Sequence, residues 1–446
     1  MSKAAQLALL LSVLGLVAVV LILLAVTFAQ TPASVKPNRA APASAPASAP
    51  ASADLTGAGI LNLGPPGTGS LTASALIMPL TWSSATSEYM IALRIGSQTI
   101  DAALDTGSAK MVVASTPVQS MSGTYVDASQ LVPVLDPSKP SHEQCAFLQA
   151  YGSETVNVVV YNGTVTFPRS ELDLDTLCAS SLVTALSGLT SGAPLVVPDF
   201  PINAITADAA GGTAQSINVL GMCPVQTTTR AAGGGYLTPA CQTVSSPVYE
   251  SEMQQALASY YASQHVDFVW SLLLGDTAAA PAGFAAFGRI NVSCLRPQFV
   301  PLVPVLPHAT VPLTQTPYRY YVVRVVQCRI AGTPLPDFPP YLMLDSGTTN
   351  VQLPGADSIA ALNGLTGSAT AELVIAGADD ASNVTLTWTQ ADAQWAGGDT
   401  FAPLDADLSN QLSSIGDVGI LGSQGLRGIF MEFNLSTKQV GFAQAA

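Results

Sequence analysis

The sequence predicts an all-β protein made of two related β-rich lobes with a few short helices. Three observations predict this fold: segments in which apolar and polar residues alternate, few stretches with helical periodicity, and a pattern that occurs in both halves of the chain. The repeated pattern is an apolar strand ending in Asp-[Ser/Thr]-Gly-[Ser/Thr], at Asp105 and again at Asp345. Further along, each half has an apolar-Leu-Gly triplet, within residues 218–222 and 419–423. Because the same signals occur twice in the same order, we expect two related lobes.

Alternation of apolar and polar residues locates the individual strands. The stretch EYMIALRIGSQTIDAALDTG, from Glu88, predicts a β-hairpin with a tight turn at Gly96 and Ser97. Further strands are expected at 268–274, 320–332, 371–388 and 428–443, and the last two segments predict hairpins that turn at 379–383 and 435–438. Helical patterns are short, and the best are 251–262 and 357–362.

The N-terminal region predicts a membrane-directed segment followed by a linker. Residues 7–29 carry no charge, and a helix of that length would cover roughly 34 Å, enough for the hydrocarbon core of a bilayer. Thr27, Phe28 and Ala29 form a tolerable cleavage site, so residues 1–30 are a signal-anchor or a signal peptide. Residues 31–80 are rich in Pro, Ala and Ser and predict an extended linker. The N-terminal and C-terminal lobes are expected at 81–300 and 301–446.

Cysteines and glycosylation sequons favour a protein of the secretory pathway. An even number of cysteines in a chain with an export or membrane segment favours disulfides, of unspecified pairing. The cysteines are Cys145, Cys178, Cys223, Cys241, Cys294 and Cys328, and the sequons begin at Asn162, Asn291, Asn383 and Asn434. We expect a single-pass anchored protein with lumenal or extracellular lobes, or a secreted protein if the N-terminal segment is cleaved.

Charge and motif content exclude several classes of function. Lys and Arg total 15 against 29 Asp and Glu, a net charge of -14, which would repel a nucleic-acid backbone. The chain has no His-Glu-x-x-His pattern of a zinc hydrolase, no Gly-x-Ser-x-Gly elbow of a serine hydrolase and no P-loop lysine. We therefore expect neither a nucleic-acid partner nor a metal or other cofactor.

The two repeated aspartates are candidate catalytic residues. A carboxylate at the end of a buried strand is costly to desolvate unless it is hydrogen-bonded, paired or protonated. If Asp105 and Asp345 face each other between the lobes, both cannot ionise, and the pair holds one proton. Such a pair combines an acid with a base, so it could activate a water that attacks a peptide carbonyl without a covalent intermediate.

The residues that follow each aspartate fit this chemistry. The glycine of each motif lets the backbone approach closely and leaves room for an amide that points at the carboxylates. The hydroxyl after the glycine can donate to an outer carboxylate oxygen, and the hydroxyl before it can bond across the interface between the lobes. These supporting residues are Thr106, Gly107 and Ser108 in the first turn and Ser346, Gly347 and Thr348 in the second.

These motifs resemble the pepsin-like aspartic endopeptidases, in which each of two lobes contributes one Asp-[Ser/Thr]-Gly turn. Asp105 and Asp345 match the catalytic positions of that family, and the resemblance extends from Glu88 to Ala446. It also includes both Leu-Gly triplets and the segments SPVYESEMQQAL, FVWSLLL and GFAAFGRI. The resemblance implies a bilobal pepsin-like fold with a cleft between the lobes, hydrolysis of polypeptide substrates, a monomer and no cofactor.

The resemblance also implies a substrate-binding flap, with two departures from the family pattern. The segment AYGSETV places the flap at Tyr151, Gly152 and Ser153. Val112 stands where most members have a tryptophan that hydrogen-bonds the flap tyrosine, and Glu154 replaces the second glycine of Tyr-Gly-x-Gly. The alternative to an active endopeptidase is therefore a catalytically weak or inactive peptide-binding relative of the same fold.

Overall fold

The computed structural model describes most of the chain from Leu76 to Gln444. The gaps lie at 116–117, 121, 137–142, 152–153, 172–189, 209–214, 228, 231–235, 238–242, 245–247, 251–252, 254–268, 276–280, 289, 291–295, 305–319, 394–399 and 405–416. Among the described residues, no helix is both long enough and apolar enough to span a membrane. The predicted signal segment at 1–30 and nearly all of the helix predicted at 251–262 fall outside them.

The described residues form mostly β-sheet, which confirms the predicted all-β class. The larger sheet contains 16 strands among the described residues. Its main path runs through β21 (Gln298–Pro301), β31 (Gln439–Gln444), β30 (Ile429–Asn434), β19 (Val269–Leu274), β20 (Gly283–Phe287), β1 (Leu76–Ser83), β2 (Glu88–Ile95), β3 (Gln98–Asp105), β13 (Val219–Gly221), β4 (Met111–Ala114), β11 (Leu195–Asp208), β8 (Glu154–Phe167) and β6 (Val132–Pro133). Off this path, β7 (Ala146–Tyr151) pairs with β8, and β9 (Ser170–Glu171) pairs with β1 and β10 (Thr190–Ser191).

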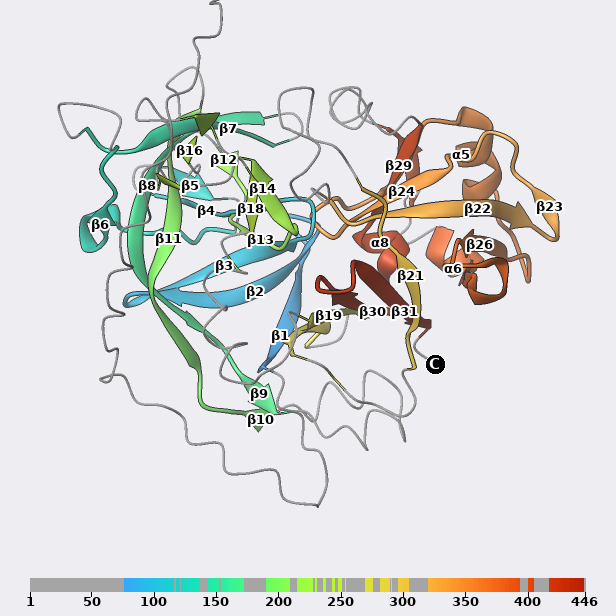
Figure 1. Ribbon diagram of the computed structural model, residues 1–446, viewed down its shortest axis with the longest axis horizontal. Helices are drawn as coiled ribbons and strands as arrows, with labels where there is room; N and C mark the ends of the chain where they lie inside the picture. The colour runs from blue at the N-terminus through green and yellow to red at the C-terminus, as the bar shows by residue number, and fades with distance from the viewer. Residues whose placement is uncertain are drawn as a thin grey trace, which may run out of the picture. The chain divides into compact units, whose positions relative to one another are not determined.

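The second lobe has a separate sheet of eight described strands, drawn in orange and red in Figure 1. In spatial order these are β27 (Val384–Trp388), β26 (Ala371–Ile375), β22 (Val322–Ile330), β24 (Tyr341–Asp345), β29 (Val418–Gly422), β25 (Val351–Leu353) and β28 (Phe401–Pro403), with β23 (Thr333–Pro334) beside β22. The helices of this lobe are short: α5 (Ala356–Asn363), α6 (Gln390–Ala393), α8 (Ser423–Leu426) and the 3-10 turn η2 (Asp380–Ser382).

The remaining described elements of the first lobe are small. They are the 3-10 turn η1 (Ala128–Gln130), the pair β5 (Gln119–Ser120) and β12 (Gln215–Ser216), the pair β14 (Val225–Thr227) and β18 (Val248–Glu250), and the group β15 (Thr229–Arg230), β16 (Tyr236–Leu237) and β17 (Thr243–Val244).

The predicted hairpins form where alternation and turn residues placed them. In the β2–β3 ladder Ile95 pairs with Gln98, which leaves Gly96 and Ser97 as a two-residue turn. Gly96 has a φ of 57°, which glycine adopts without the penalty that a side chain would add. The hairpins β26–β27 and β30–β31 and the helix α5 also match their predicted segments.

The two lobes share one arrangement around their aspartates, which confirms the internal repeat. In the first lobe β13 lies parallel to β3 with Gly221 opposite Asp105. In the second, β29 lies parallel to β24 with Gly422 opposite Asp345. A Cβ on Gly221 would lie 2.4 Å from the backbone nitrogen of Lys110. Each Leu-Gly triplet therefore ends in glycine because the chain that leaves the aspartate turn passes directly over it.

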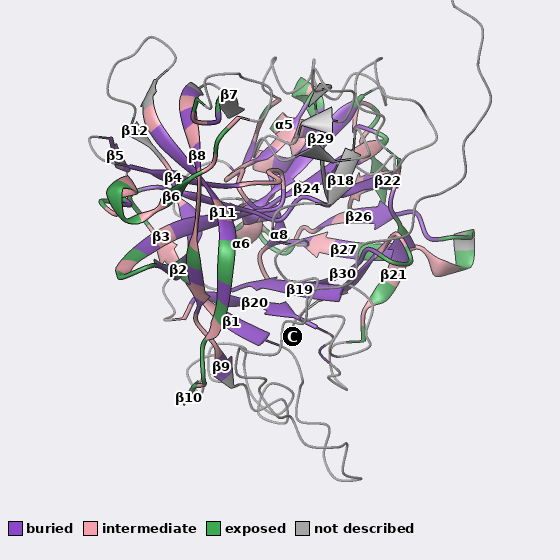
Figure 2. Cartoon of the chain, turned by 60° about the vertical axis from the view of Figure 1, so that its left-hand side comes forward, coloured by how far each residue is buried: buried purple, intermediate pink, exposed green. Residues whose placement is uncertain are grey.

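The larger sheet crosses the predicted lobe boundary. Residues 301–446 are predicted as the C-terminal lobe, but β30 and β31 pair with β19 and β21 in the larger sheet. All six residues of β30 are buried, as are those of β19, so both strands need cover on both faces (Figure 2). Similarly, β1 begins at Leu76 within the predicted linker 31–80 and pairs with β20, because its LIMPL segment is apolar enough to be buried.

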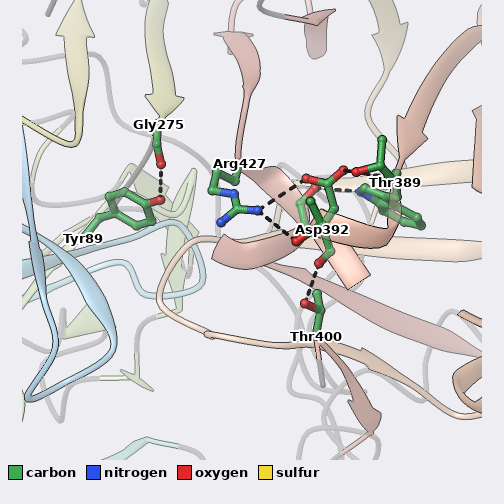
Figure 3. A network of polar contacts seen from close by, with 9 residues as sticks. Tyr89, Gly275, Thr389, Asp392, Thr400 and Arg427 are labelled. Atoms are coloured by element: carbon green, nitrogen blue, oxygen red, sulfur yellow. Dashed lines mark hydrogen bonds and ion pairs between the residues drawn. The ribbon is translucent and has the colours of Figure 1, made fainter. Parts of the chain in front are cut away.

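A polar network fixes the short helices of the second lobe (Figure 3). Arg427 lies 3.4 Å from Oδ1 of Asp392 in an ion pair. The backbone and side chain of Thr389 donate to Oδ2 of Asp392 at 2.7 and 2.8 Å, and Thr400 donates to the Asp392 carbonyl. These contacts connect α6, β28 and Arg427, the residue after α8. Helix α8 begins directly after Gly422, the glycine of the second Leu-Gly triplet.

The described cysteines are not all disulfide-bonded. Cys145 is disulfide-bonded. By contrast Cys328 is a free thiol in the interior of β22, fully buried, and burial raises its pKa to about 12. The disulfides that the even count favours therefore do not include Cys328, which lies in a core strand. Cys178, Cys241 and Cys294 lie outside the described residues.

The described sequons differ in exposure. Asn162 in β8 and Asn383 after η2 are half-buried. Asn434, at the end of β30, is only 4% exposed, and its Oδ1 accepts a hydrogen bond from the Thr437 amide at 3.1 Å. Because a glycan needs an exposed asparagine, we do not expect one at Asn434.

Candidate active site

The structure places the two repeated aspartates at equivalent strand ends. Asp105 is the last residue of β3 and Asp345 is the last residue of β24. Their exposed fractions are 8% and 6%, so both carboxyl groups are nearly buried. Such burial requires hydrogen bonds or a shared proton, and both aspartates have them.

The same pair of donors supports each carboxyl group. Oδ1 of Asp105 accepts from the Gly107 amide at 2.7 Å, and Oδ2 accepts from the Ser108 hydroxyl. In the second turn, Oδ1 of Asp345 accepts from the Gly347 amide at 3.0 Å, and Oδ2 accepts from the Thr348 hydroxyl at 2.8 Å. These hydrogen bonds fix both carboxyl planes.

Reciprocal hydrogen bonds join the two turns. The hydroxyl of Thr106 accepts from the Ser346 amide and donates to the Leu344 carbonyl, each at 2.8 Å. The hydroxyl of Ser346 accepts from the Thr106 amide at 3.1 Å and donates to the Leu104 carbonyl. Thr106 and Ser346 are each 1% exposed. This buried brace holds the two aspartates in register.

The carboxyl groups lie within proton-sharing reach. A Cβ on Gly107 would lie 2.7 Å from the Asp345 carboxyl carbon, and a Cβ on Gly347 would lie 2.4 Å from that of Asp105. Each glycine therefore lies against the opposite carboxyl group, where no side chain fits.

Burial and mutual charge favour a shared proton. Burial raises the pKa of Asp345 well above its ordinary value of 3.8, and the charge of Asp105 and their hydrogen bond raise it further. The bonds from Thr348 and Gly347 act in the opposite direction but are weaker influences. Asp345 therefore keeps its proton to a higher pH than an ordinary aspartate, as a carboxyl group that acts as an acid must.

Of the predicted flap, the structure describes the strands but not the tip. Tyr151 ends β7 and pairs with Glu154 of β8, so the hairpin turns at Gly152 and Ser153, which lie outside the described residues together with the side chain of Tyr151. Val112, at the tryptophan position of the resemblance, is fully buried in an apolar cluster and offers no hydrogen-bond donor from its side chain.

Two polar residues beside the site were not identified from the sequence. Glu88, the first residue of β2, is only 4% exposed, and the Thr349 hydroxyl lies 3.1 Å from the Ser87 carbonyl and 3.4 Å from Oε1 of Glu88. Burial raises the pKa of Glu88 well above 4.5, and the charges of Asp105 and Asp345 raise it further. The available signal was an acidic residue at the start of an otherwise apolar strand.

The strand that carries Glu88 is fixed by its next residue. The Tyr89 hydroxyl donates to the Gly275 carbonyl at 2.6 Å, as Figure 3 shows. Among the described residues, no group of three or more His, Cys, Asp or Glu side chains is placed to hold a metal ion.

Comparison with solved structures identifies the fold. The crystal structure of the aspartic proteinase from Irpex lacteus superposes with a TM-score of 0.53 at 16% sequence identity, covering 84% of this chain and 98% of that chain. No family model matches the chain, and no curated protein matches its sequence. The likeness concerns the fold: the chain has the bilobal architecture of pepsin-like proteins, as the sequence predicts.

Proposed function

We propose that this protein is an aspartic endopeptidase of the pepsin-like family, which hydrolyses peptide bonds with a water activated between Asp105 and Asp345. The observation that carries the proposal is the pair of buried carboxyl groups, each of which accepts from a glycine amide and a hydroxyl of its own turn and lies against the glycine of the opposite turn. The fold of the Irpex lacteus aspartic proteinase adds support.

The site can perform the reaction in two proton-transfer steps. The ionised carboxyl takes a proton from the bound water, whose oxygen attacks the peptide carbonyl carbon while the protonated carboxyl gives its proton to the carbonyl oxygen. The resulting tetrahedral diol then collapses: one carboxylate takes back a hydroxyl proton, the other carboxyl protonates the amide nitrogen, and the carbon–nitrogen bond breaks. The brace of Thr106 and Ser346 keeps both carboxyl groups aligned through these steps.

Replacing one acid of the pair tests the proposal. We expect Asp105→Asn and Asp345→Asn each to lower kcat for cleavage of an unfolded polypeptide on the order of 10³-fold, because each removes one proton-transfer group. The matched control is Asp101→Asn, on the same strand β3, which should cleave as the wild type does. A statine-type inhibitor should block wild-type cleavage. Cleavage that survives Asp105→Asn would contradict the proposal.

A peptide-binding protein without activity is the second candidate. It is favoured by Val112, which offers no side-chain hydrogen bond toward a flap, and by Glu154, which begins β8 at the position of the second glycine of the flap pattern. Under this alternative the wild-type chain would bind an unfolded polypeptide with the same affinity as Asp345→Asn, and neither would release fragments over the acidic and neutral pH range.

We further propose that the lobes work on the lumenal or extracellular side of a membrane of the secretory pathway. The disulfide at Cys145 supports an oxidising compartment. Determination of the N-terminus of the mature protein separates an uncleaved anchor, which begins near Met1, from a secreted form that begins near Gln30.

A further inference from the structure

The hairpin of β7 and β8 extends beyond the described part of the neighbouring strand β11. Among the described residues, the ladder between β8 and β11 ends at Val156, whereas β7 continues to pair with β8 as far as Tyr151 and Glu154. Directly before β7, the Cys145 amide donates to the Val134 carbonyl at 2.8 Å. Among the described strands β7 itself pairs with β8 alone, so side-chain contacts contribute to its position.

A lysine just after the first aspartate turn makes such a contact. The Nζ of Lys110 lies 4.2 Å from the centre of the Phe147 ring in β7, within the range of a cation–π interaction. The backbone of Lys110 is fixed beneath, because its carbonyl accepts from the Gly221 amide at 2.9 Å. The cation therefore projects from a rigid part of the turn.

Phe147 connects the contact with Lys110 to the apolar core of the first lobe. Its half-buried ring packs on the apolar cluster that contains Val112 and Val158. A restraint on Phe147 therefore restrains the backbone of β7, which pairs with β8 as far as Tyr151.

Lys110 is not among the causes that shift the pKa of Asp345. The charge that raises the pKa of Asp345 is that of Asp105, and the remaining causes are burial and hydrogen bonds. The contact that the structure defines for the Lys110 side chain is the cation–π contact with Phe147.

We propose that Lys110 is a positioning residue that, through its cation–π contact with Phe147, holds the β7–β8 hairpin over the first aspartate turn and so favours substrate binding. This inference rests on the proposed endopeptidase function, in which the hairpin carries the flap. We call the contact between Lys110 and Phe147 the tether. It lies near the start of β7 and joins this strand to the chain that follows the Asp105 turn.

Substitutions at both ends of the contact test the inference. Lys110→Met keeps the apolar stem and removes the cation, so we expect KM to rise about two- to fivefold, the change that corresponds to one cation–π contact, with kcat and both limbs of the pH profile unchanged. Lys110→Arg keeps a cation and should restore the wild-type KM. Phe147→Leu should raise KM similarly, and the double variant with Lys110→Met should add nothing further.

Hydrogen exchange of 146–160 provides a readout that does not need activity. Amides of β7 should exchange faster in Lys110→Met than in the wild type and in Lys110→Arg. Lys438→Met, on the turn between β30 and β31, controls for the loss of one positive charge and should leave exchange in β7 unchanged.

Two kinds of outcome would overturn the tether. One is wild-type KM and wild-type exchange in Lys110→Met, and the other is effects of Lys110→Met and Phe147→Leu that simply add. If the wild type cleaves no polypeptide, the proposed endopeptidase function fails by itself, and the exchange of β7 alone decides whether Lys110 holds the hairpin.

Discussion

The two aspartate turns are alike in the contacts that support their carboxyl groups and different in what lies beside them. Each carboxyl accepts from a glycine amide and from a hydroxyl, and each turn contributes one half of the brace. Beside the second turn, however, Thr349 contacts the buried Glu88. The equivalent of Thr349 in the first turn is Ala109, which cannot form this contact.

The strand registers identify the counterpart of Glu88. In the first lobe Met90 pairs with Ala103, which lies two residues before Asp105. In the second lobe Val322 pairs with Met343, which lies two residues before Asp345. Counting back along β2 and β22, Glu88 corresponds to Tyr320.

Tyr320 belongs to an apolar cluster against which Ala109 packs. The symmetric part of the site is thus the part that the proposed chemistry needs, whereas the asymmetric part adds a third ionisable group on one side only. The two lobes are therefore alike in their aspartate turns and differ in the residues beside the turns.

Among the tests of this comparison, the largest expected effect is the loss of activity when the glycine of either aspartate turn is replaced. These glycines belong to the part of the site that is alike in both lobes. A Cβ at Gly347 or Gly107 would collide with the opposite carboxyl group at 2.4 or 2.7 Å. We expect Gly107→Ala and Gly347→Ala each to lower kcat/KM on the order of 100-fold by displacing that group. Steady-state kinetics on a peptide substrate measures the loss. Gly96→Ala has open space around the Cβ position but a φ of 57° that strains a side chain, so as a control it should cost some stability and leave kcat/KM unchanged. Activity retained in either turn variant would contradict the close approach.

The brace is expected to have the next largest effect. Thr106→Val leaves the buried Ser346 amide and Leu344 carbonyl without their partner, at about 1–3 kcal/mol for each group. Ser346→Ala removes the reciprocal bonds, so the losses in free energy of unfolding should be similar. Chemical denaturation measures both, and Thr106→Ser, which keeps the hydroxyl, is the control. Markedly unequal losses would show that the brace is itself asymmetric.

The smallest effect tests the asymmetric part and depends on pH. The pKa of Glu88 is raised in the folded protein above its ordinary value of 4.5. Below that value both folded and unfolded chains keep the proton. As pH rises above it, the unfolded chain releases the proton first, so stability falls by up to about 1.4 kcal/mol per pH unit until the folded pKa is reached.

Glu88→Gln removes this loss because it cannot ionise. We expect its unfolding temperature to exceed that of the wild type increasingly as pH rises from 4.5, with no such gain below that pH. Asp337 provides a control of opposite sign, since hydrogen bonds from Ser358 lower its pKa, and Asp337→Asn should cost stability at neutral pH and not at low pH. A constant difference between Glu88→Gln and wild type at every pH would contradict the burial of a neutral Glu88.

Local patterns predicted most of the fold and the centre of the site. Short contiguous stretches form the β2–β3 hairpin, both aspartate turns and the Leu-Gly triplets. Their periodicity and turn residues can be recognised in the sequence alone. The contact between Glu88 and Thr349 joins distant segments, so no local signal reports it. The linker boundary at residue 80 missed the start of β1, and the even cysteine count did not identify Cys328 as a free thiol, because both depend on strand partners that lie far away in the sequence.

The C-terminal hairpin has a consequence for how the chain is made. The strands β19, β20 and β1 precede the sheet of the second lobe in the sequence, whereas β30, the described strand on the other edge of β19, follows it. Until β30 has been made, the backbone of β19 presents an open edge to other nascent chains. Completion of this sheet therefore requires that the second lobe be synthesised first, and chaperone protection of that edge would matter most during this interval.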